Sequence, residues 1–147
     1  MPREAIVMIE TSVDDCNPQV IGYVLERALE MGALDAYTTP VQMKKGRPGV
    51  VITRLARPAD GEALAALLLR ETTSLGVRLQ PCERLVLERR LVRVETPYGP
   101  ITLKVAGEKA APEYEECRAA ARRHGVPLAQ VEAAARAAFC GWDAGRP

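Results

Sequence analysis

The chain has 147 residues, 48% hydrophobic and 27% charged, and this balance predicts one globular domain with a single buried core. Its 20 basic and 19 acidic residues leave a net charge of +1, which argues against a surface built for nucleic acid or an anionic membrane. No apolar stretch approaches the roughly 20 residues that span a bilayer, and the segment MPREAIV lacks the features of a signal peptide. We therefore expect a cytoplasmic protein.

The first 80 residues alternate between strand and helix periodicity. Asn17 and Pro18 suit the first positions of a helix, and Gly32 suits its end. The glycines and proline of KKGRPG indicate a turn between two strands. The expected elements are a strand at about 4–13, a helix at 18–31, strands at about 34–43 and 49–57, a helix at about 59–74 and a strand after Gly76.

This order, βαββαβ, predicts an α+β protein with a ferredoxin-like core. Two right-handed crossovers interleave in that fold into a four-stranded antiparallel sheet of order 4-1-3-2, with both helices on one face. Pro40 lies in the second expected strand and Pro81 in the fourth. Because proline is confined to edge strands or bulges, both positions agree with the two edges of such a sheet.

The remainder of the chain predicts a β-hairpin and two short helices. The hairpin strands are expected at 91–96 and 101–106 around PYGP, and the helices begin near Pro112 and Pro127. We expect the tail CGWDAGRP to be irregular. Residues 1–90 would form the ferredoxin-like core, and residues 91–147 an extension packed on the same domain.

The chain has four cysteines and one histidine, and neither residue type indicates a metal centre. Cys16, Cys82, Cys117 and Cys140 form no CxxC pair. His124 follows two arginines at the end of an expected helix, where a surface cation is favoured by the helix dipole. A borderline metal such as nickel or zinc therefore has no evident ligand set in this chain alone.

In the expected topology, three polar segments meet at one end of the sheet, beside the start of the first helix. Carboxylates hold Mg²⁺ or Mn²⁺ through hard oxygen atoms, while lysine, arginine and a helix N-terminus bind phosphate. Such a combination indicates a nucleotide site. The segments are DDCNP with Asp14 and Asp15, MKKGRPG with Lys44, Lys45 and Arg47, and RETTSLGVR with Glu71, Thr72, Thr73, Ser74 and Arg78.

Each segment also has an ordinary structural interpretation. Asp14 and Asp15 could be acids favoured by a helix start, KKGRPG a solvated turn, and ETTSLG a polar helix end before a glycine. Each of these interpretations is favoured for its own segment, and the convergence of the three segments at one end puts a binding site on an even footing with them.

Four motifs add a resemblance that spans nearly the whole chain: IETSVDDCNPQVIGYVLERALEMGALDAYTTPVQMKKGRPG, RETTSLGVR, TPYGPITLKVA and PEYEEC. Together they resemble the C-terminal domain of the nickel insertion proteins that complete the nickel-pincer nucleotide cofactor of lactate racemase. The resemblance implies a CTP-dependent cyclometallase, of the lyase or chelatase class, that inserts nickel into pyridinium-3,5-bisthiocarboxylic acid mononucleotide. In that family this domain would hold CTP with Mg or Mn in a homo-oligomer, a trimer or hexamer.

The resemblance also implies roles for individual residues. Asp14 and Asp15 would be metal ligands or would hydrogen-bond to the metal ligands. The family's larger N-terminal domain is not part of this chain and would be its partner, so nickel would be the inserted ion without being held by this chain alone. The nucleotide-binding residues implied by the motifs are Lys44, Lys45, Arg47, Arg78, Thr72, Thr73 and Glu113.

Two other classes of function fit the same order of elements. A ferredoxin-like regulatory or oligomerisation module would use its exposed sheet face as an interface and would catalyse nothing. An RNA-recognition module would stack bases on aromatic side chains of the first and third strands. Both of those strands lack aromatic residues, so we do not favour the RNA-binding class.

Overall fold

The computed structural model describes residues 1–144, with side chains described through residue 141. The chain divides into two compact units, Arg3–Leu85 and a second unit that begins at Val86 and includes Met1–Pro2. Each unit has its own hydrophobic cluster. The composition predicted a single core, and this is wrong because composition counts apolar residues without showing how they are divided. The boundary falls at 85/86 instead of 90/91, and packing of the C-terminal part on the first unit stays a prediction.

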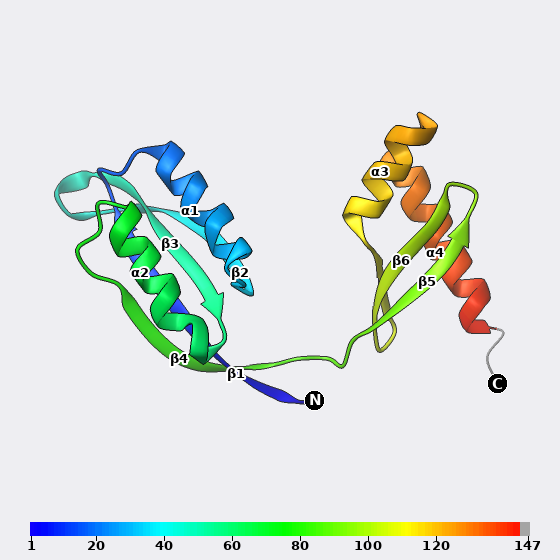
Figure 1. Ribbon diagram of the computed structural model, residues 1–147, viewed down its shortest axis with the longest axis horizontal. Helices are drawn as coiled ribbons and strands as arrows, with labels where there is room; N and C mark the ends of the chain where they lie inside the picture. Colours follow the sequence, from blue (N-terminus) through cyan, green and yellow to red (C-terminus); the bar gives the residue numbers. More distant parts are fainter. Residues whose placement is uncertain (145–147) are drawn as a thin grey trace. The chain divides into compact units, whose positions relative to one another are not determined.

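The first unit follows the predicted order of strands and helices (Figure 1). The second helix is shorter than predicted, because a separate 3₁₀ turn precedes it and Thr72 ends it. The elements are β1 (Arg3–Val13), α1 (Pro18–Glu30), β2 (Asp35–Gln42), η1 (Lys44–Gly46), β3 (Pro48–Ala56), η2 (Pro58–Asp60), α2 (Gly61–Glu71) and β4 (Arg78–Leu85).

The four strands of the first unit form one antiparallel sheet in the order β2-β3-β1-β4. This is the predicted order 4-1-3-2 read from the other edge. Pro40 and Pro81 therefore lie in the two edge strands, β2 and β4. Both helices cover the same face of the sheet (Figure 1).

The core of the first unit lies between this sheet and the two helices. Alternate residues of β1 point toward the helices and are buried, among them Ile9, which is 0% exposed. Leu64 and Leu68 of α2 meet them from the other side, as the apolar stripe of that helix predicts. Burying a leucine side chain contributes about 1.5–3 kcal/mol relative to leaving it exposed.

The second unit is a three-stranded antiparallel sheet, β5-β6-β7, with a core closed by α3 and α4. The predicted hairpin, β5 and β6, is present, but the short strand β7 was not predicted. Its sequence, KAAP, has no β-branched or aromatic residue and contains a proline. The elements are β5 (Arg90–Thr96), β6 (Gly99–Ala106), β7 (Lys109–Pro112), α3 (Tyr114–His124) and α4 (Leu128–Ala144).

The last helix corrects a second prediction. The tail CGWDAGRP was expected to be irregular, yet α4 continues to Ala144. Gly141 lies inside this helix, because a single glycine costs only about 1 kcal/mol relative to alanine and does not end an alanine-rich helix. The last three residues of that tail lie outside the described residues.

Helix α3 behaves as its charges predict. Glu115 and Glu116 lie in its first turn, and His124 lies exposed in its last turn. Gly125 follows with a φ of 64°, the left-handed conformation that ends many helices. The thiol of Cys117 points into the core of this unit, and burial raises its pKa.

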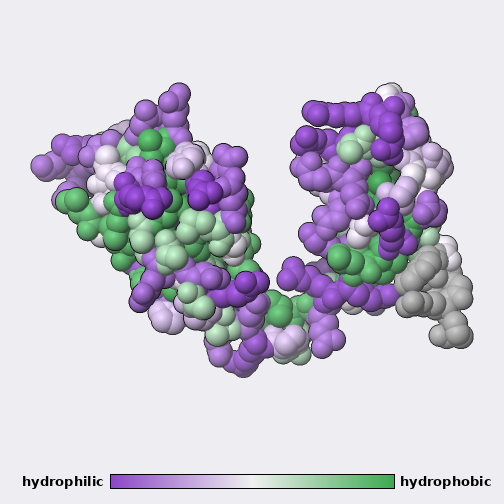
Figure 2. All heavy atoms as spheres, in the orientation of Figure 1, coloured by the Kyte–Doolittle hydropathy of each residue, from purple (hydrophilic) through white to green (hydrophobic). Residues whose placement is uncertain are grey.

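Figure 2 shows one face of each unit, on which both hydrophilic and hydrophobic side chains are exposed. In the part of the chain that the structure describes, no helix combines the length and the apolar character needed to cross a bilayer.

The separate cores predict that the first unit folds alone. We expect residues 1–85 to give a cooperative thermal transition followed by circular dichroism at 222 nm, because the core of this unit is made only of its own residues. The full chain is the control. A fragment that melts without a transition would show that the first unit depends on the second.

Candidate functional site

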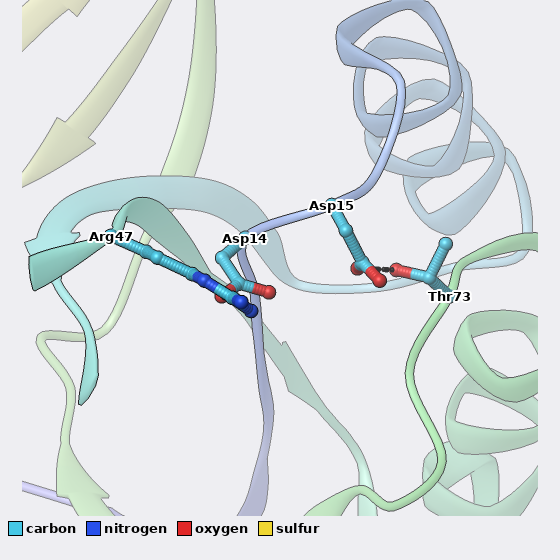
Figure 3. Close-up of polar contacts among 4 residues, drawn as sticks. All are labelled: Asp14, Asp15, Arg47 and Thr73. Atoms are coloured by element: carbon cyan, nitrogen blue, oxygen red, sulfur yellow. Dashed lines mark hydrogen bonds and ion pairs between the residues drawn. The ribbon is translucent and has the colours of Figure 1, made fainter. Parts of the chain in front are cut away.

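Three loops of the first unit meet at one end of its sheet. The guanidinium of Arg47, after η1, lies 3.5 Å from the carboxylate of Asp14, after β1. The hydroxyl of Thr73, after α2, donates to the carboxylate of Asp15 at 2.6 Å. Figure 3 shows these four side chains side by side. The predicted convergence of the three polar segments is therefore confirmed.

The strand register places these loops together. At the end of β1, Val13 pairs with Val50 at the start of β3. On the other side, Glu10 pairs with Arg78, the first residue of β4. The Arg78 guanidinium also donates to the hydroxyl of Ser12 at 3.3 Å. Because β1 pairs with both neighbours, its last residues are flanked by the turn before β3 and by the loop before β4.

The first helix begins at the same end. Asn17 caps it, its side-chain oxygen accepting from the backbone N–H of Gln19 at 2.9 Å, and Pro18 occupies the first turn. Asp14 and Asp15 thus lie just before a helix N-terminus, where its positive partial charge stabilises carboxylates or another anion.

The two neighbouring carboxylates have different partners. Asp14 faces Arg47, whereas Asp15 faces Thr73 (Figure 3). The Asp14 side chain is only 17% exposed. Among residues 1–144 there is no group of three or more histidine, cysteine, aspartate or glutamate side chains arranged to hold a metal ion. This end of the sheet therefore offers two neighbouring carboxylates, with the Thr73 hydroxyl beside one of them.

The side chains of Lys44 and Lys45 are exposed, and neither forms a hydrogen bond or ion pair with another described side chain. Lys45 has a φ of 60° and is the one non-glycine residue with positive φ in the described chain. The left-handed conformation costs a lysine on the order of 1 kcal/mol, and strain of this kind often accompanies function. The left-handed backbone of Lys45 lies in the exposed turn that also carries Arg47.

The two threonines differ in what their hydroxyl groups do. Thr72 donates to the carbonyl of Leu68 at 2.7 Å and accepts from the N–H of Ser74 at 3.2 Å. Its hydroxyl therefore caps the end of α2. Thr73, by contrast, is exposed, and its hydroxyl contacts only the Asp15 carboxylate among the described residues.

Glu113 is not brought to this site within the first unit. It belongs to the second unit, where its carboxylate lies 2.8 Å from the ammonium of Lys104. Its backbone N–H donates to the carbonyl of Thr102 at 2.8 Å. These contacts fix Glu113 at the start of α3 and give it a structural role in its own unit.

A shallow groove of about 260 Å³ lies beside Asp14. Its volume is just below the range of roughly 300–1,000 Å³ for small-molecule pockets. The groove alone is therefore too small to enclose a large ligand, most of which would lie over the surrounding charged loops. Its lining combines the end of β1, the start of α1 and the start of β3: Val13, Asp14, Cys16, Pro18, Ile21, Pro48, Gly49 and Val50.

Sequence reasoning missed the residues that hold the loops in place. Thr11 lies on the inner face of β1, where its hydroxyl contacts that of Ser74 and donates to the carbonyl of Gly76 at 2.9 Å. It is 2% exposed. A polar residue in the inward alternation Val7, Ile9, Thr11 was the available signal.

Gly49 is the second such residue. A Cβ at this position would lie 2.6 Å from the carbonyl oxygen of Val13 and 2.5 Å from the sulfur of Met43. The turn that carries Arg47 therefore approaches the end of β1 as closely as only glycine permits. A glycine inside a strand pattern often indicates such an approach.

We predict that Gly49→Ala destabilises the first unit by about 1–3 kcal/mol, since the backbone of Val13 cannot move aside easily. Gly22→Ala is the matched control. Gly22 lies on the exposed face of α1 with no atom within 4 Å of an added Cβ, so this change should stabilise by about 0.5–1 kcal/mol. Urea denaturation measures both, and equal effects would contradict the close approach.

The fold and the cluster define an α+β protein of two units whose first unit gathers carboxylates and guanidinium groups at a helix start. The family model described as "Nickel insertion protein" matches residues 1–132. The chain belongs to the nickel insertion protein family.

Two relatives support this membership. A "Putative nickel insertion protein" of Pelobacter propionicus is 47% identical over 133 residues, which cover 87% of this chain and 34% of the relative. The pyridinium-3,5-bisthiocarboxylic acid mononucleotide nickel insertion protein of Acetivibrio thermocellus is 43% identical over 132 residues, covering 87% of this chain and 32% of that protein. The chain thus spans about a third of the length of the curated relatives it matches.

Two solved structures are similar to this one. One is the apo form of LarC2, the C-terminal domain of a cyclometallase involved in the synthesis of the NPN cofactor of lactate racemase. It has a TM-score of 0.89 and 39% identity, and the match covers 94% of this chain and 99% of that domain. The protein MK0293 of Methanopyrus kandleri AV19 shares the fold alone, with a TM-score of 0.62 and 24% identity over 95% of this chain and 90% of that one.

Proposed function

We propose that this chain is the C-terminal, CTP- and divalent-metal-binding part of a CTP-dependent nickel insertion enzyme, or cyclometallase, in nickel-pincer nucleotide cofactor biosynthesis. The observation that carries the proposal is the meeting of Asp14 and Asp15 with Arg47 and Arg78 at one end of the first unit. Membership of the nickel insertion family indicates which ligand such a cluster serves.

The carboxylates suit magnesium or manganese bound together with a phosphate chain. Asp14 and Asp15 would hold the cation, which would neutralise the phosphate charge. Mg²⁺ usually retains several waters and takes only one or two protein carboxylates beside substrate phosphates. Two neighbouring carboxylates would therefore be enough for such a site.

The cations suit a triphosphate. Lys44 and Lys45 are exposed on the turn, and Arg47 and Arg78 lie on either side of the end of β1. Their charge-assisted hydrogen bonds to phosphate oxygens would be stronger than neutral ones. Thr73 adds a hydroxyl beside Asp15. We retain Thr72 and Glu113 in the proposed set through the family resemblance, although both side chains have structural partners here.

The proposed partners follow from the relatives. Because the relatives are about three times as long as the matched region, we propose that the N-terminal domain of the nickel insertion protein acts with this chain and handles nickel, the inserted ion. A homo-oligomer, trimer or hexamer, in the cytoplasm completes the proposal.

An alternative is a regulatory or oligomerisation module without catalysis. The face of the first sheet opposite the helices is uncovered within its unit and carries Met8, Leu55 and Tyr37, the last of which is 42% exposed. This face could pair with another copy while the polar end is merely solvated. An oligomer is expected under both proposals, so nucleotide binding separates them.

The proposal predicts that CTP with Mn²⁺ raises the melting temperature of the chain by several degrees in differential scanning fluorimetry, and ATP much less. A ligand at about 100 times its Kd stabilises the native state by about 2.7 kcal/mol. Asp14→Ala should abolish the shift, whereas Asp35→Ala, at the start of β2, should retain it. The absence of a shift with millimolar CTP would favour the non-catalytic module.

A second substitution separates the charge of Lys45 from the shape of its turn. Lys45→Gly removes the ammonium but suits the left-handed backbone, so the free protein should melt at the same or a slightly higher temperature. The CTP-dependent shift should fall by half or more, because a phosphate-binding cation is lost. Lys45→Arg, which retains the charge, should preserve most of it. If CTP raises the melting temperatures of Lys45→Gly and Lys45→Arg equally, the ammonium of Lys45 does not bind phosphate, even if the two free proteins melt at different temperatures.

A further inference from the structure

Arg54 is a buried charge in the core of the first unit. It lies in β3, between Ile9 of β1 and Ala36 of β2, on the sheet face covered by the helices, and it is 0% exposed. One guanidinium nitrogen donates to the carbonyl of Leu64 in α2 at 2.7 Å, and the other to the carbonyl of Val24 in α1 at 2.9 Å. The arginine therefore links the backbones of the two helices.

Burying this guanidinium costs desolvation free energy that an apolar side chain would not. No carboxylate among the described residues forms an ion pair with Arg54, and its Nε has no hydrogen-bond partner there. Burial lowers the pKa of Arg54 to about 10, so the group remains charged at neutral pH. Apolar residues of similar volume often replace buried charges with no loss of stability. What the guanidinium adds is a fixed distance between two helices.

The loop before α1 and the loop after α2 meet at the candidate site, where Thr73 donates to Asp15. Helix α1 starts at that end of the sheet and α2 finishes there, so the helices run in opposite directions. Val24 lies seven residues after Asn17 and Leu64 eight residues before Thr72. At 1.5 Å per residue both carbonyls lie ~10–12 Å along their helices from the site.

We propose that Arg54 is a positioning residue for the candidate site. By holding Val24 and Leu64 at fixed places, it sets how far α1 and α2 are displaced along each other. That displacement decides whether Asp15, just before α1, meets the hydroxyl of Thr73, just after α2. Its effect on ligand affinity rests on the proposed function, while its effect on the Asp15–Thr73 contact does not.

A second set of contacts limits how far the loss of Arg54 should displace Thr73. The loop after α2 is also attached to β1, because Thr11 contacts Ser74 and Gly76. Arg54 thus fixes the helix that leads into the loop, Thr11 fixes the exit of the loop, and Thr73 lies between them. Losing Arg54 should weaken the placement of Thr73 without abolishing it.

The test replaces the guanidinium by an apolar side chain of similar length, Arg54→Met. Arg57→Met is the control, since Arg57 is an exposed arginine directly after the same strand. Among the described residues its side chain forms an ion pair only with Asp60, at 4.0 Å. Two quantities are measured: the amide NMR shifts of Asp15 and Thr73 in the free protein, and the Kd of CTP with Mn²⁺ by calorimetry at 25 °C.

We expect Arg54→Met to melt no more than a few degrees below the wild type, to shift both amides and to weaken CTP binding by about tenfold, the middle of the range for coupled residues. Arg57→Met should neither shift the amides of Asp15 and Thr73 nor weaken CTP binding. In a Thr73→Val background, Arg54→Met should cost much less affinity, because the contact it positions is already gone.

The proposal is overturned if the amides of Asp15 and Thr73 move no more in Arg54→Met than in Arg57→Met, or if the two substitutions at Arg54 and Thr73 act additively. If Arg54→Met does not fold, Arg54→Lys, which can reach one carbonyl but not both, is judged by the same criteria. If the wild type binds no CTP, the proposed function fails, and the amide shifts still decide the role of Arg54.

Discussion

The arrangement of the first unit depends on the pairing of β1 with a neighbour on each side. β3 and β4 both run antiparallel to it, and both registers are fixed over several residues. A shift of β1 by one residue against both neighbours would turn Ile9 away from the helices and expose it. The same register brings Val13 opposite Val50 and Glu10 opposite Arg78. Burial of the core and assembly of the polar end are therefore consequences of one set of hydrogen bonds.

Two polar side chains on the buried face of the sheet connect that core to the site. Thr11 and Arg54 both point toward the helices, and both are satisfied largely by backbone carbonyls. Each one joins the sheet to a segment that packs on it, Thr11 to the loop before β4 and Arg54 to both helices. Directional contacts of this kind define a position, whereas apolar packing alone permits small displacements. Buried polar contacts thus hold the helices and the loop on which Asp15 and Thr73 meet.

The sequence was sufficient for the order of elements, the sheet order and the meeting of the three polar loops. Periodicity, the prolines of the edge strands and the helix caps all act locally and point to the same topology. The features that the sequence did not predict depend on contacts between distant residues. Arg54 interrupts the alternation of β3, and its partners are main-chain carbonyls that have no sequence signal. The strand KAAP owes its conformation to pairing with β6 instead of to its own residues, and the division into two cores depends on distant contacts.

The division of the apolar residues into two closed clusters affects how the chain tolerates change. A cavity opened beside Val131 in the second unit leaves every packing contact around Ile9 intact, so the effects of substitutions in different units should add as independent terms. Sequence drift in either core is then constrained mainly by the residues of that core.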